Sequence, residues 1–204
     1  MKKILTIIFL AIALNHGYSQ NVSYGFGAGL NYSSLILTNL PNESPRYKAG
    51  YQFNAIIEYG FDNRWGIRIE PGFVNRGTIF SYPNLSDTKI NLNYITLPIL
   101  VRFSPIEKFS ILLGPECSYR AMAKAIYNGK SNDIKSIYDS NFDFSINAGI
   151  SFNVFDNFEL GLRYNRGFIS TIENLRFFDQ YGIDKGRAIL CNQGVTVTII
   201  YLMK

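Results

Sequence analysis

Apolar and polar residues alternate without a break in Phe142-Asp143-Phe144-Ser145-Ile146-Asn147-Ala148-Gly149-Ile150-Ser151-Phe152-Asn153-Val154. Successive side chains of a β-strand point to opposite faces, so this period of two predicts a strand with one apolar face. Similar alternation recurs at about 22–37, 48–59, 64–77, 89–103, 109–123, 158–168 and 188–202. The sequence therefore predicts an all-β fold of eight strands. In segment 89–103 the alternation slips near Tyr94 and Ile95, which predicts a β-bulge there.

Long and short connections alternate between these segments. The long ones are 38–47, 78–88, 124–141 and 170–187, and the short ones centre on Asp62-Asn63, Pro105-Ile106 and Asp156-Asn157. This arrangement is typical of outer-membrane β-barrels, which have short periplasmic turns and long external loops. The segment 61–68 also recurs, with one insertion, as 155–163, which indicates a repeated hairpin of an antiparallel meander.

The two faces of the expected strands differ in charge. One face is wide and apolar, whereas the opposite face carries glycine together with acidic and basic residues. A membrane barrel turns its apolar face to lipid and its polar face to the lumen. A buried charge without a partner costs several kcal/mol, so charges inside a narrow barrel must pair. We therefore expect an eight-stranded antiparallel up-and-down transmembrane β-barrel with a structural polar network in its lumen, formed by Glu58, Arg68, Glu70, Glu116, Arg120 and Arg163.

Aromatic residues gather towards the ends of the expected strands. Tyr and Trp are enriched where membrane proteins cross the membrane–water interface. The sequence therefore predicts an interfacial girdle that includes Tyr24, Tyr59, Trp65, Phe103, Phe109, Phe155, Phe158 and Tyr201.

The first nineteen residues have the pattern of a secretory signal peptide. Lys2 and Lys3 precede an apolar run at 4–14, and small residues follow at 17–19. That run is shorter than the roughly 20 residues that a transmembrane helix needs, which argues against an uncleaved anchor. We expect a signal peptide at 1–19 and a barrel domain at 20–204, which crosses the membrane with strands.

Several kinds of chemistry are disfavoured by composition. The only histidine, His16, lies in the expected signal peptide. A mature chain without histidine has no Ser-His-Asp triad, Cys-His pair or His-ligated zinc. Carboxylates remain, but none marks a recognisable substrate cleft, so we expect no enzyme, cofactor or metal. The formal charge of +5, which falls to +3 without Lys2 and Lys3, is too scattered to predict nucleic-acid binding.

The cysteines and an early glycine repeat are assigned to strands. Cys117 and Cys191 fall on expected strands that are not neighbours, and a disulfide needs Cα atoms within about 7 Å. We expect two free thiols on the apolar face. Gly25, Gly27 and Gly29 alternate with apolar residues and precede no helical pattern, so they indicate small strand positions rather than a nucleotide loop.

Four motifs resemble those of the PorT-like outer-membrane β-barrel family of Bacteroidetes. They are the Gly25–Gly29 repeat, Asn93-Tyr94-Ile95-Thr96-Leu97-Pro98-Ile99-Leu100-Val101-Arg102-Phe103, Gly114-Pro115-Glu116 and Gly161-Leu162-Arg163-Tyr164. The resemblance implies an outer-membrane location and an eight-stranded barrel, and little about activity. Its name-giving member is associated with protein secretion and gliding, but no residue here carries that role over. The end Tyr201-Leu202-Met203-Lys204 lacks the terminal aromatic of many such barrels.

An eight-stranded barrel has room for side chains but not for a wide channel, which argues against a general porin. The expected function is that of an integral outer-membrane protein of structural or interaction type that displays four external loops. Its partners are outer-membrane lipid and other envelope proteins, and the sequence does not specify an oligomeric state. Two alternatives remain open at this point, namely a lipid-modifying outer-membrane enzyme and a soluble periplasmic binder of an apolar ligand.

Overall fold

The computed structural model describes residues 22–38, 45–81, 86–138, 140–168, 176–178, 184–187 and 189–203. The expected signal peptide lies outside these residues. The strands are β1 Val22–Thr38, β2 Arg46–Gly60, β3 Trp65–Ile69, β4 Gly72–Phe80, β5 Thr88–Ile106, β6 Phe109–Tyr127, β7 Lys130–Asp133, β8 Phe142–Phe155, β9 Phe158–Gly167, β10 Arg176–Phe178, β11 Asp184–Arg187 and β12 Ile189–Met203. One short 3₁₀ helix, η2, spans Lys135–Ile137. Across the described ranges, no helix has the length and apolar character needed to cross a membrane.

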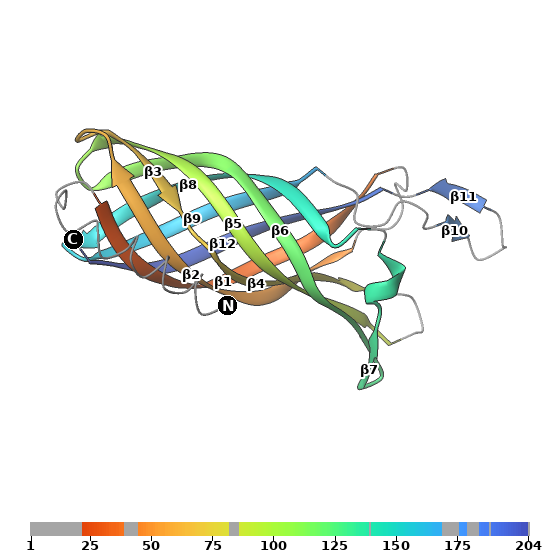
Figure 1. Ribbon diagram of the computed structural model, residues 1–204. Coiled ribbons are helices and arrows are strands. Elements are labelled where there is room, and N and C mark those ends of the chain that lie inside the picture. Colours follow the sequence, from red (N-terminus) through yellow and green to blue (C-terminus); the bar gives the residue numbers. More distant parts are fainter. Residues whose placement is uncertain are drawn as a thin grey trace, which may run out of the picture.

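The long strands close into a barrel (Figure 1). Each pairs with its neighbours in antiparallel fashion, in the order β1, β2, β3 with β4, β5, β6, β8, β9 and β12, and β12 returns to pair with β1. This ring of eight strand positions confirms the predicted eight-stranded antiparallel barrel. Turns 61–64, 107–108 and 156–157 lie at one end, called here the short-turn end, and the strand ends that the longer connections join lie at the opposite, long-loop end.

The third predicted strand is broken in two. β3 and β4 are separated at Glu70 and Pro71, because proline has no N–H to donate to a ladder. The carbonyl of Pro71 still accepts a hydrogen bond from the N–H of Ala55 at 2.9 Å, so the barrel wall continues across the break.

One turn lies two residues further along the chain than the sequence indicates. β5 continues through Pro105 and Ile106, and the turn is formed by Glu107 and Lys108. Pro105 fits within the strand because the ladder between β5 and β6 is irregular between Phe103 and Ile106, where no regular N–H donor is needed.

The apolar faces of the strands point out of the barrel. On β8, Phe144, Ile146 and Ile150 are 41%, 39% and 44% exposed, whereas inside the barrel Arg68 is fully buried and Glu116 is 3% exposed. This is the arrangement of a membrane barrel rather than of a soluble one. The alternative of a soluble binder with an apolar interior is therefore wrong.

The predicted bulge is present, but its extra residue lies on β6. Asn93 pairs with Met122 and Tyr94 pairs with Arg120, so Ala121 is left without a partner on β5. Up to the bulge, Tyr119 lies outward and Arg120 inward in the regular register of β6. The bulge shifts the faces beyond it, so that Ala123 is buried and Lys124 exposed.

The side chains of β5 itself alternate without a slip from Thr88 to Val101. The irregularity in the sequence is instead an inversion of polarity between the two faces. Outward residues are polar at Lys89, Asn91 and Asn93 and apolar from Ile95 onward. The strand thus keeps its geometry while its outer surroundings change from polar to apolar.

The lumen is layered along the barrel axis. Ile56, Ile200 and Leu202 form an apolar cluster at the short-turn end. Charged side chains fill the centre. A larger apolar cluster, called here the long-loop core, consists of Leu35, Val74, Ile90, Leu92, Tyr94, Ala123, Tyr138 and Leu190. Apolar groups therefore occupy both ends of the lumen.

Aromatic side chains surround the outside of the barrel in contact pairs. Near the short-turn end, Trp65 lies 4.5 Å from Phe103 and Phe158 lies 5.2 Å from Tyr201, between ring centroids. Towards the long-loop end, Tyr32 stacks on Tyr47 at 5.0 Å. These positions fit the two interfacial girdles of a membrane barrel.

Candidate functional site

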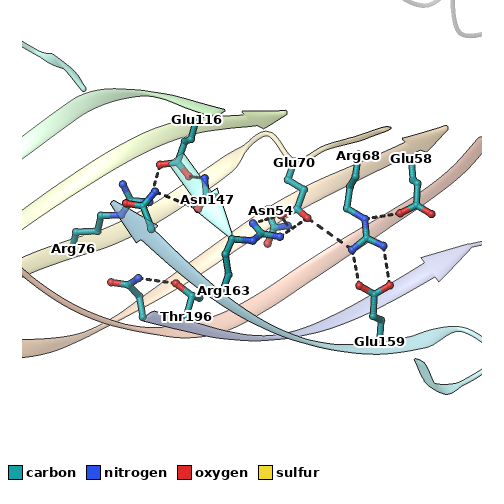
Figure 2. A network of polar contacts seen from close by, with 12 residues as sticks. Asn54, Glu58, Arg68, Glu70, Arg76, Glu116, Asn147, Glu159, Arg163 and Thr196 are labelled. Carbon is teal, nitrogen blue, oxygen red and sulfur yellow. Dashed lines mark hydrogen bonds and ion pairs between the residues drawn. The ribbon is translucent and has the colours of Figure 1, made fainter. Parts of the chain in front are cut away.

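The centre of the lumen holds a first ion-pair cluster, formed by Glu58, Arg68, Glu70, Arg102, Glu159 and Arg163. Figure 2 labels all of these side chains except that of Arg102. Arg68 on β3 is the hub of the cluster. The Nε of Arg68 donates to Glu58 on β2 at 2.5 Å, and its two terminal nitrogens donate to both oxygens of Glu159 on β9 at 2.6 and 2.8 Å. Such a forked guanidinium–carboxylate pair fixes orientation as well as charge.

The cluster continues through Glu70, which follows β3. The two terminal nitrogens of Arg163 on β9 each donate to one oxygen of Glu70 at 2.7 Å, and Arg68 lies 3.9 Å from the same carboxylate. On the other side, Arg102 on β5 lies 3.2 Å from Glu58. Three guanidinium groups thus face three carboxylates, and this charge balance lets ionised groups persist away from water.

A second ion-pair cluster lies nearer the long-loop end and is centred on Glu116 of β6. Arg76 on β4 donates to Glu116 at 2.7 Å, Asn147 on β8 donates to it at 2.9 Å, and Ser118 at 2.8 Å. Inward-facing neighbours on three strands therefore serve one carboxylate. Both clusters arise because alternate residues of each strand face the lumen.

Arg120 does not join the carboxylates, although the sequence placed it in one network with them. It is fully buried, and no described carboxylate lies within 4.0 Å of it. Its guanidinium lies 3.8 Å from the ring centre of Tyr138, and its Nε donates to the hydroxyl of Tyr94 at 3.3 Å. Ile134 and Asn141 are hydrogen-bonded to β6 at Ala123 and Arg120, and Tyr138 between them supplies the aromatic face, which sequence alternation does not reveal.

Two neighbouring residues of β6 hold this connection from both sides of the barrel wall. Inside, Arg120 donates to the carbonyl of Ser140 at 3.0 Å. Outside, the ammonium of Lys135 lies 5.5 Å from the ring centre of Tyr119 and donates to the carbonyl of Ala121, the bulge residue, at 3.2 Å. Burial raises the pKa of the Tyr138 phenol, so this side chain of the connection stays neutral beside Arg120.

The structure brings Glu58, Arg68, Glu70 and Arg163 together and places Glu116 in the separate second cluster. It adds Glu159, Arg76 and Arg102, which the sequence did not assign to the network. Glu159 and Arg76 stand on strand faces that the alternation already marks as polar. Arg102 could have been found by continuing the inward register of β5 past Leu100.

Neither a metal centre nor a disulfide is found in the described part of the chain. No group of three or more His, Cys, Asp or Glu side chains there could hold a metal ion. Cys117 and Cys191 are both free thiols. Cys117 is exposed, whereas Cys191 is only 8% exposed although it lies in the outward register of β12, so the expectation that both lie on the open apolar face holds only for Cys117.

Comparison with solved structures shows the same fold. Neisserial surface protein A is 12% identical, with a TM-score of 0.57 over 87% of this chain and 96% of that chain. The attachment invasion locus protein Ail of Yersinia pestis is 19% identical, with a TM-score of 0.52 over 90% of this chain and 100% of that chain. Ail in complex with the heparin analogue sucrose octasulfate gives a TM-score of 0.50 at the same identity and coverage. No curated protein matches the sequence.

A family model described as "Outer membrane protein beta-barrel domain" matches residues 18–173, which is most of the chain. The match agrees with the closed antiparallel ring, the outward apolar faces and the charged lumen. The chain therefore belongs to this outer-membrane β-barrel family and is an integral protein of the outer membrane.

Proposed function

We propose that this protein works as a binding surface, and that its long-loop end faces the outside of the cell and binds anionic ligands. The supporting observation is the charge at that end. The basic side chains described there that are not buried are Arg46, Lys48, Lys89, Lys124, Lys130, Lys135 and Arg166, whereas the acidic ones that are not buried are Asp87 and Asp133. A surface of one sign attracts ligands of the opposite sign.

The short-turn end has no such excess. Its exposed charged residues, Asp62, Arg64, Glu107, Lys108 and Asp156, nearly cancel. In barrels of the outer membrane the short turns face the periplasm and the long loops face outward. The proposed orientation thus puts the basic end where extracellular or outer-leaflet anions are met.

The interior supports a surface function rather than transport. Apolar clusters occupy both ends of the lumen, and ion pairs fill its centre. We infer that the residues Glu58, Arg68, Glu70, Glu116, Arg120 and Arg163 have a structural role and that the protein has no catalytic activity. An acyl-transfer or deacylation assay on lipid A with the purified protein tests this second point, since turnover would contradict it.

A sulfated glycan is a suitable probe, because Ail was crystallised with the heparin analogue sucrose octasulfate. The full chain in lipid nanodiscs should bind fluorescent heparin, and added salt should weaken the binding by screening. Each lysine or arginine near an anionic surface contributes about 1 kcal/mol to the free energy of binding. A variant with both Lys89→Glu and Lys124→Glu should therefore lose about tenfold or more in affinity for heparin.

Lys108→Glu is the matched control, since it reverses an exposed lysine at the short-turn end. It should leave heparin binding unchanged. Equal losses in the two variants, or no binding to the wild-type protein, would overturn the proposal.

Two finer assignments are also proposed here. The motifs at 93–103 and 161–164 support kinship with the PorT-like branch, which a phylogeny of outer-membrane barrels would test. The pattern of residues 1–19 supports a cleaved signal peptide, which N-terminal sequencing of the protein from outer membranes would test. Other envelope proteins are further candidate partners, and cross-linking in native membranes would identify them.

A further inference from the structure

A small cavity lies in the lumen between the two ion-pair clusters. Its volume is about 20 Å³, and its lining includes Arg76 and Glu116 from the second cluster and Glu70 and Arg163 from the first (Figure 2). A cavity needs roughly 10–15 Å³ of such volume to hold one water molecule. The space therefore suits a single water molecule.

Several polar atoms of the lining residues have no partner in the protein. The unpartnered donors are Nε and Nη1 of Arg76 and Nε of Arg163. The unpartnered acceptors are the side-chain oxygens of Asn54 and Asn165. Buried polar groups nearly always have a hydrogen-bond partner, so five such atoms around one cavity indicate a bound polar species.

The orientation of both amides is fixed by their other bonds. The NH₂ group of Asn54 donates to Glu70 at 3.2 Å, and that of Asn165 donates to the side-chain oxygen of Asn147 at 3.2 Å, whose own NH₂ group donates to Glu116. Because a carboxylate can only accept, Asn54 cannot be reversed without losing its bond. The groups left for a ligand are therefore amide oxygens together with guanidinium N–H groups.

This mixture selects the chemistry of the ligand. An anion would be repelled by the amide oxygens and by Glu116, and a cation would be repelled by the guanidinium groups of Arg76 and Arg163. Each guanidinium is already neutralised by its own carboxylate, at 2.7 Å in both pairs. The cavity thus requires a neutral species that donates and accepts hydrogen bonds at once, as water does.

We infer that one water molecule is bound in this cavity, where it accepts from the guanidinium of Arg76 or Arg163 and donates to the side-chain oxygens of Asn54 and Asn165. It joins the two ion-pair clusters into one continuous polar column. The inference is independent of what the long-loop end binds, because it uses only atoms inside the lumen.

A crystal structure of the full chain, at a resolution that shows ordered water, tests this inference. We expect one peak within hydrogen-bond distance of Arg76 or Arg163 and of an Asn oxygen, and no anomalous signal there after a bromide soak. An empty cavity, or a bromide peak in it, would overturn the assignment.

Val74 lines the same cavity and supplies a matched pair of variants. Val74→Leu enlarges the side chain and should displace the water, whereas Val74→Ala should retain it. A water peak that persists unchanged in Val74→Leu would contradict the proposed location. The density of the wild-type protein decides the question by itself, so a variant that fails to fold leaves the test intact.

Discussion

The central section of the barrel and its long-loop section are built from the same strands but with opposite polarity. In the central section, apolar side chains lie outside and ion pairs lie inside. In the long-loop section, the long-loop core lies inside and the outward side chains of β5 are polar. β5 passes through both sections, and along it the outer face changes from Lys89, Asn91 and Asn93 to Ile95, Leu97 and Ile99.

The difference shows that the polarity of each strand face depends on the medium around it and not on the geometry of the strand. A strand alternates in the same way in lipid and in water, but its apolar face turns towards whichever side is dry. On β12 the change falls between Gln193, which donates to the hydroxyl of Tyr47 at 2.8 Å, and the outward, apolar Val195. We therefore place the membrane surface at the level of Asn93 and Gln193, with the long-loop section beyond it.

The largest effect is expected from the hub of the charged section. Arg68→Met leaves Glu58 and Glu159 buried without their main partner, and breaking such a pair costs about 3–5 kcal/mol. Urea unfolding of the barrel in lipid vesicles measures this loss. Lys89→Met, at an exposed site of the long-loop section, should change stability by no more than about 0.5 kcal/mol. An Arg68→Met barrel as stable as the wild type would contradict the role of the ion pairs.

The interior of the long-loop section should respond as the core of a soluble protein does. Leu92 is fully buried there, so Leu92→Ala should cost about 2–5 kcal/mol through lost contacts and a cavity. Leu97→Ala lies on the same strand but faces lipid, which can fill the space, and should cost clearly less. Thermal or urea unfolding compares the two. A larger effect of Leu97→Ala would reverse the assignment of the two sections.

A charge placed on the outer face should locate the boundary along β5. Ile99→Arg puts a cation against hydrocarbon and should destabilise the barrel by about 2–4 kcal/mol if it lies near the midplane. Asn91→Arg, eight residues earlier in the same outward register, should be nearly neutral. Equal folding yields for both variants would show that the polarity change does not mark the membrane surface.

The smallest effect concerns a turn outside both sections. The N–H groups of Trp65 and Arg64 donate to Asp62 and lower the pKa of its carboxyl group. The stabilisation of the turn is therefore present above the unfolded-state pKa of Asp62 and is lost as pH falls through the lower folded-state value. Amide exchange at Trp65 should accelerate in acid after correction for its intrinsic pH dependence. Asp62→Asn should abolish this acid-dependent acceleration of exchange at Trp65. Asp156→Asn is the control and should leave the acceleration unchanged.

Alternation predicts the eight strand positions of the ring and most of their faces, because it depends only on neighbouring residues. Pairing across the ring was not predictable in the same way. Arg68 and Glu159 are 91 residues apart, and they meet only because the ring closes with a particular stagger of its strands. The separation of Arg120 from the carboxylates has a related cause, since its partner Tyr138 comes from a connection whose path has no sequence period.

The slip in alternation near Tyr94 predicts a bulge, and in the structure it also marks the point where the surroundings of the outer face change from polar to apolar. A fixed rule about which face is apolar fails where a strand leaves the membrane. Pro71 shows another limit, because alternation continues through it from Arg68 to Arg76 while the hydrogen-bonded ladder does not.

Ala121 has a consequence that reaches well past its own small side chain. Because it has no partner on β5, Ala121 determines which face of β6 each residue from Met122 to Tyr127 occupies. If Ala121 were instead paired in a regular ladder, each residue beyond it would move to the opposite face, so that Lys124 would point into the long-loop core and Ala123 towards water. The basic character of the outer rim therefore depends on the number of residues in this strand as much as on their identity.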